Sequence, residues 1–245
     1  DEVVIRSTGS ALSTNTPPPP PSTGTNYQAS PATVNTNVLA LYRFDNSYAE
    51  TSGRFAALTP AGAARFDAAN LGWMNSPSGA ALRFNDVGDK ATVTLNNPEF
   101  YKPGVTESIA VEAMVYINSY KGYSRTTANL IKLYKRWDLQ LMHSQDMWAN
   151  AAAAWGGVSQ IVDADRLALY LKTGCWQKVG VVLDAAGYKV LVNDVQVAQR
   201  ADASALANWT GTSSTTLEIG NFDGWVDEVV IRSTGSALST NTPPP

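Results

Sequence analysis

The same 19-residue segment occurs twice in this chain, once at each end. Residues 1–19 and residues 227–245 both read DEVVIRSTGSALSTNTPPP, and the two copies are 226 residues apart. An identical internal match of this length indicates a tandem repeat, in which a whole structural unit has been copied. We interpret the chain as one full repeat followed by the beginning of the next.

The doubled segment also predicts the domain boundaries. DEVVIRS has the pattern of a short apolar strand, and the stretch behind it is rich in Gly, Ser, Thr and Pro, with five consecutive prolines at Pro17–Pro21. Such a stretch is either a semi-rigid polyproline II spacer or plainly disordered. We therefore predict four segments: 1–8, the closing strand of a preceding repeat; 9–37, a Thr/Ser/Pro-rich linker; 38–233, the folded domain; and 234–245, the start of the next linker.

Composition excludes several classes of function. The net charge is −3 with no run of Lys or Arg, which argues against a nucleic-acid partner. No apolar run approaches the roughly 20 residues that span a bilayer, so we expect no membrane insertion. The single cysteine, Cys175, stands beside Trp176 at the start of an apolar strand and is expected to be a small buried hydrophobic residue. The linker composition favours an extracellular or cell-surface location, and we expect a bacterial surface protein.

Alternating apolar residues predict an all-β domain. In the segment from 108 to 117 the apolar residues fall on every second position, as in a strand with one buried face. Residues 51–79 are expected to form a loop, and residues 145–159 a loop in which the alanine run could make a short helix. Strands are predicted at 38–44, 80–86, 90–95, 108–117, 129–134, 137–144, 166–172, 176–184, 187–193, 195–199, 215–221 and 225–233.

Five segments, in this order along the chain, resemble laminin-G-like, concanavalin A-like jelly-roll domains: LALYRFDNS, ALRFNDVGDKATV, SIAVEAMVYI, WQKVGVVLDAAGYKVLVNDVQVA, and TLEIGN with FDGWVDEVVI. Met114 stands where the family pattern has Trp. The resemblance implies a two-sheet antiparallel jelly-roll sandwich with adjacent first and last strands. Such domains include sugar-binding modules, adhesion repeats and a few enzymes, so the fold leaves the function open.

The resemblance also implies a structural calcium ion near the ends of the first and last strands. The matching positions are Asp45 and Asp227, and oxygen ligands of this kind suit calcium. The alternative is that Asp45, like Asp86 and Asp89, simply caps a turn.

The sequence offers no catalytic constellation. Glycosidases need two carboxyl groups flanking one bond, whereas Glu112 is alone on its strand and Asp227 and Glu228 are adjacent, on opposite faces of an ideal strand. His143 is the only histidine, which leaves a Ser-His-Asp triad and a histidine metal site unsupported. We predict that the protein is not an enzyme.

Two surfaces remain as candidates for binding. Trp73, Trp148, Trp155 and Trp209 lie in predicted loops and are candidates for stacking on a sugar, although loop tryptophans can also anchor loops to the domain. Trp137, Trp176 and Trp225 begin strands and are expected in the core. The second candidate is a contact between repeats, made by Val3, Val4 and Ile5 and by their counterparts Val229, Val230 and Ile231.

The doubled strand allows two arrangements of neighbouring copies. The closing strand folds back into its own domain in a tandem array, or it pairs with the sheet of a neighbour in a strand-exchanged fibre. We favour the array. The predicted function is a non-enzymatic extracellular repeat of a long surface adhesin or filament, with neighbouring copies and glycans as partners. The alternative is a carbohydrate-binding module attached to a polysaccharide-degrading enzyme.

Overall fold

The structure, a computed structural model, describes most of the region predicted as the domain and the ten residues before position 36. The predicted closing-strand copy at residues 1–8 lies outside this part of the chain. The described residues are 26–35, 37–67, 79–96, 106–119, 129–133, 137–141, 147–154, 157–160, 172–201, 206 and 214–234.

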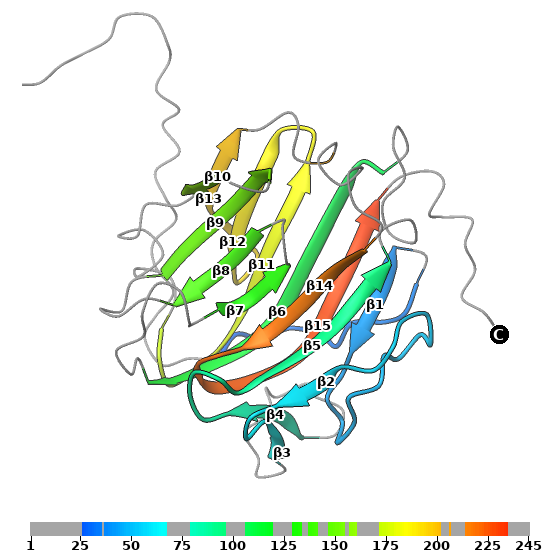
Figure 1. Ribbon diagram of the computed structural model, residues 1–245, viewed down its shortest axis with the longest axis vertical. Coiled ribbons are helices and arrows are strands. Elements are labelled where there is room, and N and C mark those ends of the chain that lie inside the picture. The colour runs from blue at the N-terminus through cyan, green and yellow to red at the C-terminus, as the bar shows by residue number, and fades with distance from the viewer. Residues whose placement is uncertain are drawn as a thin grey trace, which may run out of the picture.

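Two antiparallel sheets form two facing layers (Figure 1). The eight-stranded sheet, here the first sheet, has the order β13-β12-β11-β6-β15-β4-β3, with β1 also paired to β15. The seven-stranded second sheet has the order β10-β9-β8-β7-β14-β5-β2. The strands are β1 (Val38–Tyr42), β2 (Thr59–Ala61), β3 (Arg65–Asp67), β4 (Ala81–Phe84), β5 (Lys90–Asn96), β6 (Ser108–Ser119), β7 (Asn129–Leu133), β8 (Trp137–Leu141), β9 (Met147–Ala154), β10 (Gly157–Gln160), β11 (Trp176–Asp184), β12 (Gly187–Val192), β13 (Val195–Ala201), β14 (Ser214–Gly220) and β15 (Asp223–Thr234).

The core lies between the sheets, and the predicted alternation supplies it. The apolar face predicted for 108–117 is almost completely buried, and alternate residues of β11, β14 and β5 meet it from both layers. Burial of one face of each sheet is the main stabilising contribution in a sandwich of this kind. Cys175 is 2% exposed, as predicted for a small buried residue.

β15 is the strand that connects the first sheet. It pairs with β6 from Asp223 to Thr234, with a bulge between Asp227 and Val230, and on its other side with β4 near its beginning and β1 near its end. The predicted adjacency of the first and last strands is therefore confirmed. Val229, Val230 and Ile231 lie in the middle of β15 and are buried in this sheet of their own domain.

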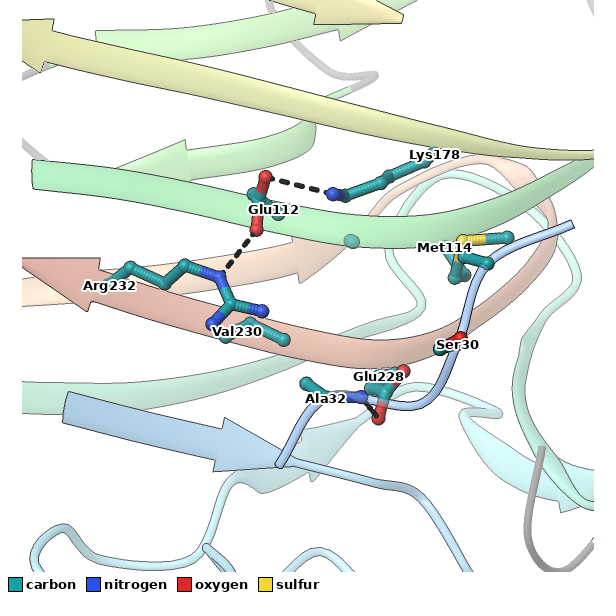
Figure 2. Close-up of a pocket in the computed structure, with 10 residues that line it drawn as sticks. Ser30, Ala32, Glu112, Met114, Lys178, Glu228, Val230 and Arg232 are labelled. Atoms are coloured by element: carbon teal, nitrogen blue, oxygen red, sulfur yellow. Dashed lines mark hydrogen bonds and ion pairs between the residues drawn. The ribbon is translucent and has the colours of Figure 1, made fainter. Parts of the chain in front are cut away.

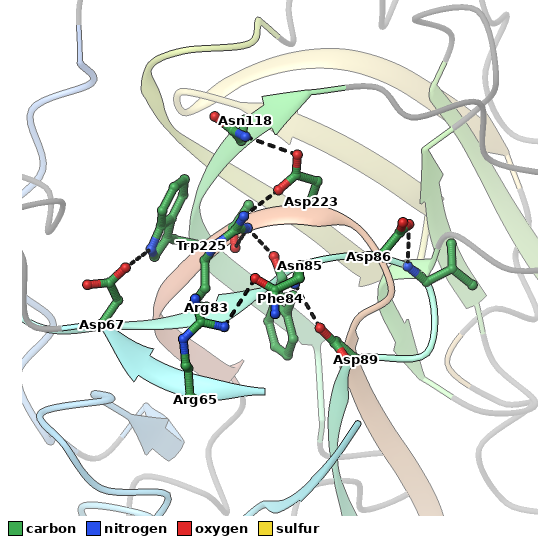
Figure 3. A network of polar contacts seen from close by, with 12 residues as sticks. Arg65, Asp67, Arg83, Phe84, Asn85, Asp86, Asp89, Asn118, Asp223 and Trp225 are labelled. Atoms are coloured by element: carbon green, nitrogen blue, oxygen red, sulfur yellow. Dashed lines mark hydrogen bonds and ion pairs between the residues drawn. The ribbon is translucent and has the colours of Figure 1, made fainter. Parts of the chain in front are cut away.

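A polar network fixes the beginning of β15 (Figure 3). The Arg83 guanidinium forms an ion pair with Asp223 at 2.5 Å and donates to the Gly224 carbonyl at 2.9 Å. The same guanidinium lies 4.2 Å from the centroid of the Trp225 ring. Asn118 on β6 donates to the other carboxylate oxygen of Asp223. These contacts join β4, β6 and β15 where the first sheet begins.

The free edge of β1 is closed by a buried carboxylate. Glu50 accepts hydrogen bonds from the backbone N–H groups of Leu41, Ser52 and Arg54 at 2.8–2.9 Å. All five residues of β1 are buried. With the Leu41 N–H bonded to Glu50 and the Leu41 carbonyl accepting from the Thr51 N–H at 2.8 Å, this part of the β1 edge is less open to a strand from another chain.

The structure corrects two predicted loops. Residues 147–154 and 157–160 form β9 and β10, so the predicted loop with a short helix is wrong there. β8 pairs with β9 from Trp137↔Ala151 to Leu141↔Met147, and this tertiary pairing overrides the helical preference of alanine. The predicted loop at 51–79 contains the short strands β2 and β3. Almost all of the predicted strand at 166–172 lies outside the described residues, and so does His143.

Residues 26–35, which were predicted to belong to the linker, lie against the first sheet, and we call them the strap. Tyr27 donates its backbone N–H to the Trp176 carbonyl at 2.8 Å, and the Trp176 N–H donates to the Asn26 side chain at 3.0 Å. Tyr27 and Ala29 pack on a second apolar cluster on the outer side of this sheet, formed by Ala81, Met114, Tyr116, Trp176 and Trp225. The strap is therefore part of the folded domain.

Gly224 tests the packing at the beginning of β15. A Cβ atom at this position would lie 2.1 Å from the Tyr116 carbonyl oxygen and 2.4 Å from the Phe222 ring, so Gly224→Ala should destabilise the domain by about 3 kcal/mol or more. The matched control is Gly180→Ala on β11, where the nearest atom would be 3.4 Å away and the change should be within about 1 kcal/mol. Urea denaturation of both variants measures the difference. Equal stability of the two variants would contradict the strand pairing described here.

Candidate functional site

The strap covers a small polar cavity on the outer side of the first sheet (Figure 2). Its lining includes Ser30 of the strap, Glu112 and Met114 of β6, and Lys178 of β11. Its volume is about 40 Å³, which is room for a few water molecules and far too little for a sugar ring. With the strap in place, this cavity is not a ligand site.

Ion pairs occupy the charged groups of this cavity. The Glu112 carboxylate contacts the Lys178 ammonium at 3.0 Å and accepts from the Arg232 guanidinium at 2.9 Å. Lys178 also forms an ion pair with Asp194 at 2.7 Å. Burial lowers the pKa of Lys178, but the hydrogen bonds and charges of Asp194 and Glu112 outweigh this effect and raise it. Glu112, expected to be a lone carboxylate on its strand, is thus the centre of a structural ion-pair network.

Glu228 and Arg43 clamp the strap at Ala32. The Glu228 carboxylate accepts from the Ala32 N–H at 2.6 Å, and Arg43 donates to the Ala32 carbonyl at 2.6 Å. Glu228 has φ +48° at a bulge of β15, a left-handed conformation that non-glycine residues rarely adopt. Its side chain is 6% exposed, and burial raises its pKa from 4.5 to about 7, against the lowering effects of the Ala32 hydrogen bond and Arg43.

The two predicted calcium ligands do not form a metal cluster with other acidic groups. One carboxylate oxygen of Asp45 is buried without a hydrogen-bond partner, whereas Asp227 accepts from the Glu228 N–H at 2.8 Å. Among the residues that the structure describes, no group of three or more His, Cys, Asp or Glu side chains could hold a metal ion. Asp89 accepts from two backbone N–H groups and Asp86 from one, as turn-capping residues do. Calcium binding therefore stays a prediction.

A row of polar residues crosses the second sheet. Glu218 on β14 is directly opposite Lys132 on β7, and the register continues across the sheet in both directions. The row, which we call the polar row, consists of Thr59, Thr92, Glu218, Lys132, Asp138, Asn150 and Gln160.

The neighbouring rows show that Glu218 and Lys132 of the polar row face away from the core. Ile219 and Ile131, one position along from Glu218 and Lys132, are directly opposite one another and fully buried. Since successive residues of a strand alternate between the two faces, Glu218 and Lys132 belong to the outward face. The side chains of both are partly exposed, and Glu218 forms an ion pair with Lys90 at 2.9 Å on this face.

The register places Trp148 in the row next to the polar row. Trp148 is opposite Gln140, and these residues lie two positions from Asn150 and Asp138 of the polar row. The prediction that Trp148 lies in a loop is wrong, because it is part of β9. The other predicted sugar-binding tryptophans, Trp73, Trp155 and Trp209, lie outside the described residues.

The three tryptophans predicted as core residues have two different settings. Trp176 and Trp225 are 2% and 8% exposed, but they lie under the strap, outside the main core. Trp137 is opposite Leu133, in a row of the second sheet whose described members are buried. The predicted sugar site missed Lys132, Asp138, Gln140 and Glu218. The alternation of these residues with apolar residues is visible in the sequence, but their alignment across three strands depends on register.

No protein-family profile matches the sequence, and no curated protein is detectably similar to it. Solved structures do match. Domain 4 of AbnA, a GH43 extracellular arabinanase from Geobacillus stearothermophilus, in complex with arabinotriose, is 15% identical with a TM-score of 0.57, and the match covers 83% of this chain and 95% of that domain.

The receptor-binding domain of the botulinum neurotoxin C/D mosaic serotype is 17% identical with a TM-score of 0.58. A structure of botulinum neurotoxin type C, whose cell entry depends on interaction with two ganglioside molecules, is 14% identical with a TM-score of 0.57. The matches cover 83% and 82% of this chain, which spans about half the length of those domains. At these identities the likeness shows the fold. It confirms the predicted concanavalin A-like, two-sheet antiparallel sandwich. Within the described residues there is no helix long and apolar enough to cross a membrane.

The clamp on the strap predicts a pH dependence of stability. Because the pKa of Glu228 is raised on folding, its contribution is fully present below pH 4.5 and is lost as the pH rises to about 7. The free energy of unfolding should fall by about 2–3 kcal/mol across this range, since one pKa unit is worth about 1.4 kcal/mol. Urea denaturation at several pH values measures this decrease.

Glu228→Gln is the control for this prediction, because it keeps the hydrogen-bond acceptor and removes the titration. Asp194 does not titrate in the same window: burial would raise its pKa, but hydrogen bonds from Lys178 and Tyr27 hold it below 3.8. An equal decrease in the wild type and in Glu228→Gln would show that the titrating group is elsewhere.

Proposed function

We propose that this protein is a glycan-binding module that uses the outward face of its second sheet. The observation that carries the proposal is the alignment of Trp148, Gln140, Asn150 and Asp138 beside the polar row. In the proposed site the Trp148 ring would stack on the C–H groups of a sugar, while the amide and carboxylate groups of the neighbouring residues would accept from and donate to its hydroxyls. The likeness to an arabinanase domain in complex with arabinotriose supports the same ligand class.

The polar row favours an uncharged oligosaccharide over an acidic one. Along the row the charges alternate, with Glu218, Lys132 and Asp138 on consecutive strands, so that no patch of one sign is formed. With strands about 4.8 Å apart, a row across seven strands is about 29 Å long, which suits several linked sugars. The proposed ligand is therefore a neutral oligosaccharide that lies across the strands.

The proposed module binds without catalysis. The described carboxylates nearest the first sheet's cavity are engaged in structure: Glu112 in two ion pairs and Glu228 in the strap clamp. In the larger protein to which such a module would belong, binding would hold an extracellular bacterial protein on a polysaccharide or on a glycan-bearing surface. This is the alternative that the sequence raised, and the fold comparisons support it better than a purely structural role.

The doubled segment favours a second candidate function, that of a repeat unit in a long surface protein. Residues 1–8 are identical to residues 227–234, which complete the first sheet of this domain. Tandem modules with weak individual affinity bind a polymer strongly through multivalency. Glycan binding and repetition are therefore compatible, with an adhesin as the combined form.

Replacement of Trp148 tests the glycan site. Trp148→Ala should lower the affinity for arabinotriose, or for a related neutral oligosaccharide, at least tenfold, about 1.4 kcal/mol, because the stacking surface is lost. Isothermal titration calorimetry with arabino-, xylo- and galacto-oligosaccharides and with sialyllactose measures this effect. Neutral oligosaccharides should bind and sialyllactose should not.

Thr94→Ala is the matched control, since Thr94 is an exposed residue of β5, two positions from Thr92 on the same face. It should leave affinity unchanged. Unaltered binding in Trp148→Ala, with loss in Trp73→Ala, Trp155→Ala or Trp209→Ala, would move the site to the other predicted tryptophans. Binding of none of these sugars would contradict the proposed ligand class.

A further inference from the structure

The strap makes the chain join the domain at one end and leave it at the other. Asn26 and Tyr27 are held at Trp176, which is aligned with Tyr116 and Trp225 across three strands. The chain leaves β15 at Thr234, which is opposite Ser108, and Ser108 is opposite Asp184. Along β11, Trp176 and Asp184 are eight residues apart, so these two points are separated by about 27 Å along the strands.

Without the strap, the two connections would lie at the same end. β1 runs antiparallel to β15, and Val38 at its start is opposite Arg232 near the end of β15. Ser233 donates its N–H to the Asn37 carbonyl at 2.9 Å. The chain would then join and leave the sandwich on neighbouring strands, side by side.

We propose that the strap gives this domain a load-bearing role, by making tension on the chain act along the strands of the first sheet. A pull between Asn26 and Thr234 slides β15 lengthwise against β6 and β1. Because backbone hydrogen bonds of antiparallel strands lie perpendicular to the strands, all the bonds of the ladder then resist together. A pull between Val38 and Thr234 would instead separate β1 from β15 one bond at a time.

The contacts of the strap are suited to carrying this load. The strap crosses the first sheet diagonally, from Tyr27 beside Trp176 on β11 to Ala32 beside Glu228 on β15. Both polar groups of the Ala32 peptide unit are held, the N–H by Glu228 and the carbonyl by Arg43. At the other end, the Tyr27 hydroxyl donates to Asp194, and burial together with this hydrogen bond raises the pKa of Tyr27 to about 12. The strap is thus fixed near both ends and along its length.

In a tandem array this arrangement would string the domains head to tail. The segment between Thr234 of one copy and the strap of the next corresponds to residues 9–25, which include the five consecutive prolines. Each domain would transmit tension along its strands to the next copy, with the Pro-rich segment as the connection. This role requires no glycan, so it can be tested independently of the proposed sugar binding.

Single-molecule force spectroscopy on the full chain, held by its two termini, tests the proposal. In the wild type the first rupture should be detachment of the strap, and it should lengthen the chain by about 15–20 Å. About twelve residues are released and extend to about 3.5 Å each, whereas the path they replace already spans about 27 Å. Tyr27→Ala and Arg43→Ala should lower the median force of this rupture at least twofold. Val34→Thr, a change of similar size at an exposed strap residue, should leave it unchanged.

A second pulling geometry keeps the test decisive if a strap variant folds poorly. A handle attached through Asn37→Cys, an exposed position, bypasses the strap when the other handle is at the C-terminus. Cys175 is buried and should not react. In this geometry the early lengthening of 15–20 Å should be absent. The median rupture force should be at least twofold lower than for the wild type held by its two termini. Equal forces in the two geometries, or no effect of Tyr27→Ala, would overturn the proposal.

Discussion

The pairing of β15 with three other strands is the constraint on which the rest of the structure depends. β6, β4 and β1 meet in one sheet only through this strand, and its alternate residues contribute to the main core. The bulge at Glu228 interrupts the pairing with β6 and turns a carboxylate toward the strap. The fold, the attachment of the strap and the positions where the chain joins and leaves the domain are all consequences of how β15 is placed.

Much of the fold could be predicted because its strands alternate cleanly. The alternating patterns of β6, β11 and β12 predict one buried face in each strand. The doubled segment marks β15, which is buried on both faces from Asp223 to Ile231. The wrong predictions for β9 and for the strap have a common cause. β9 is an alanine-rich segment whose local preference is helical, and only its pairing with β8 makes it a strand. The strap looks like a continuation of the linker, because Tyr27 and Ala32 acquire their contacts from residues about 150 and 196 positions away.

The candidate site was less predictable, because it depends on register. Trp148 was recognisable as a candidate for stacking, but nothing local shows that Gln140 lies opposite it or that Asp138 aligns with Lys132 and Glu218. A shift of one residue in any of these pairs would move the side chains to the core face. The charged groups on the outer side of the first sheet were equally hidden: Glu112 is isolated in sequence, yet two cations from β11 and β15 surround it.

The two identical copies of the closing strand permit the most direct test of this account. Ile231 and Ile5 stand in the same sequence context, and Ile231 is 2% exposed in the main core. If residues 227–234 complete the sheet of their own domain, Ile231→Ala should lower the free energy of unfolding of the monomer by about 2–5 kcal/mol, and Ile5→Ala should leave it unchanged. Urea denaturation of the two variants gives the comparison. A larger cost for Ile5→Ala, or equal costs for both, would contradict the placement of β15.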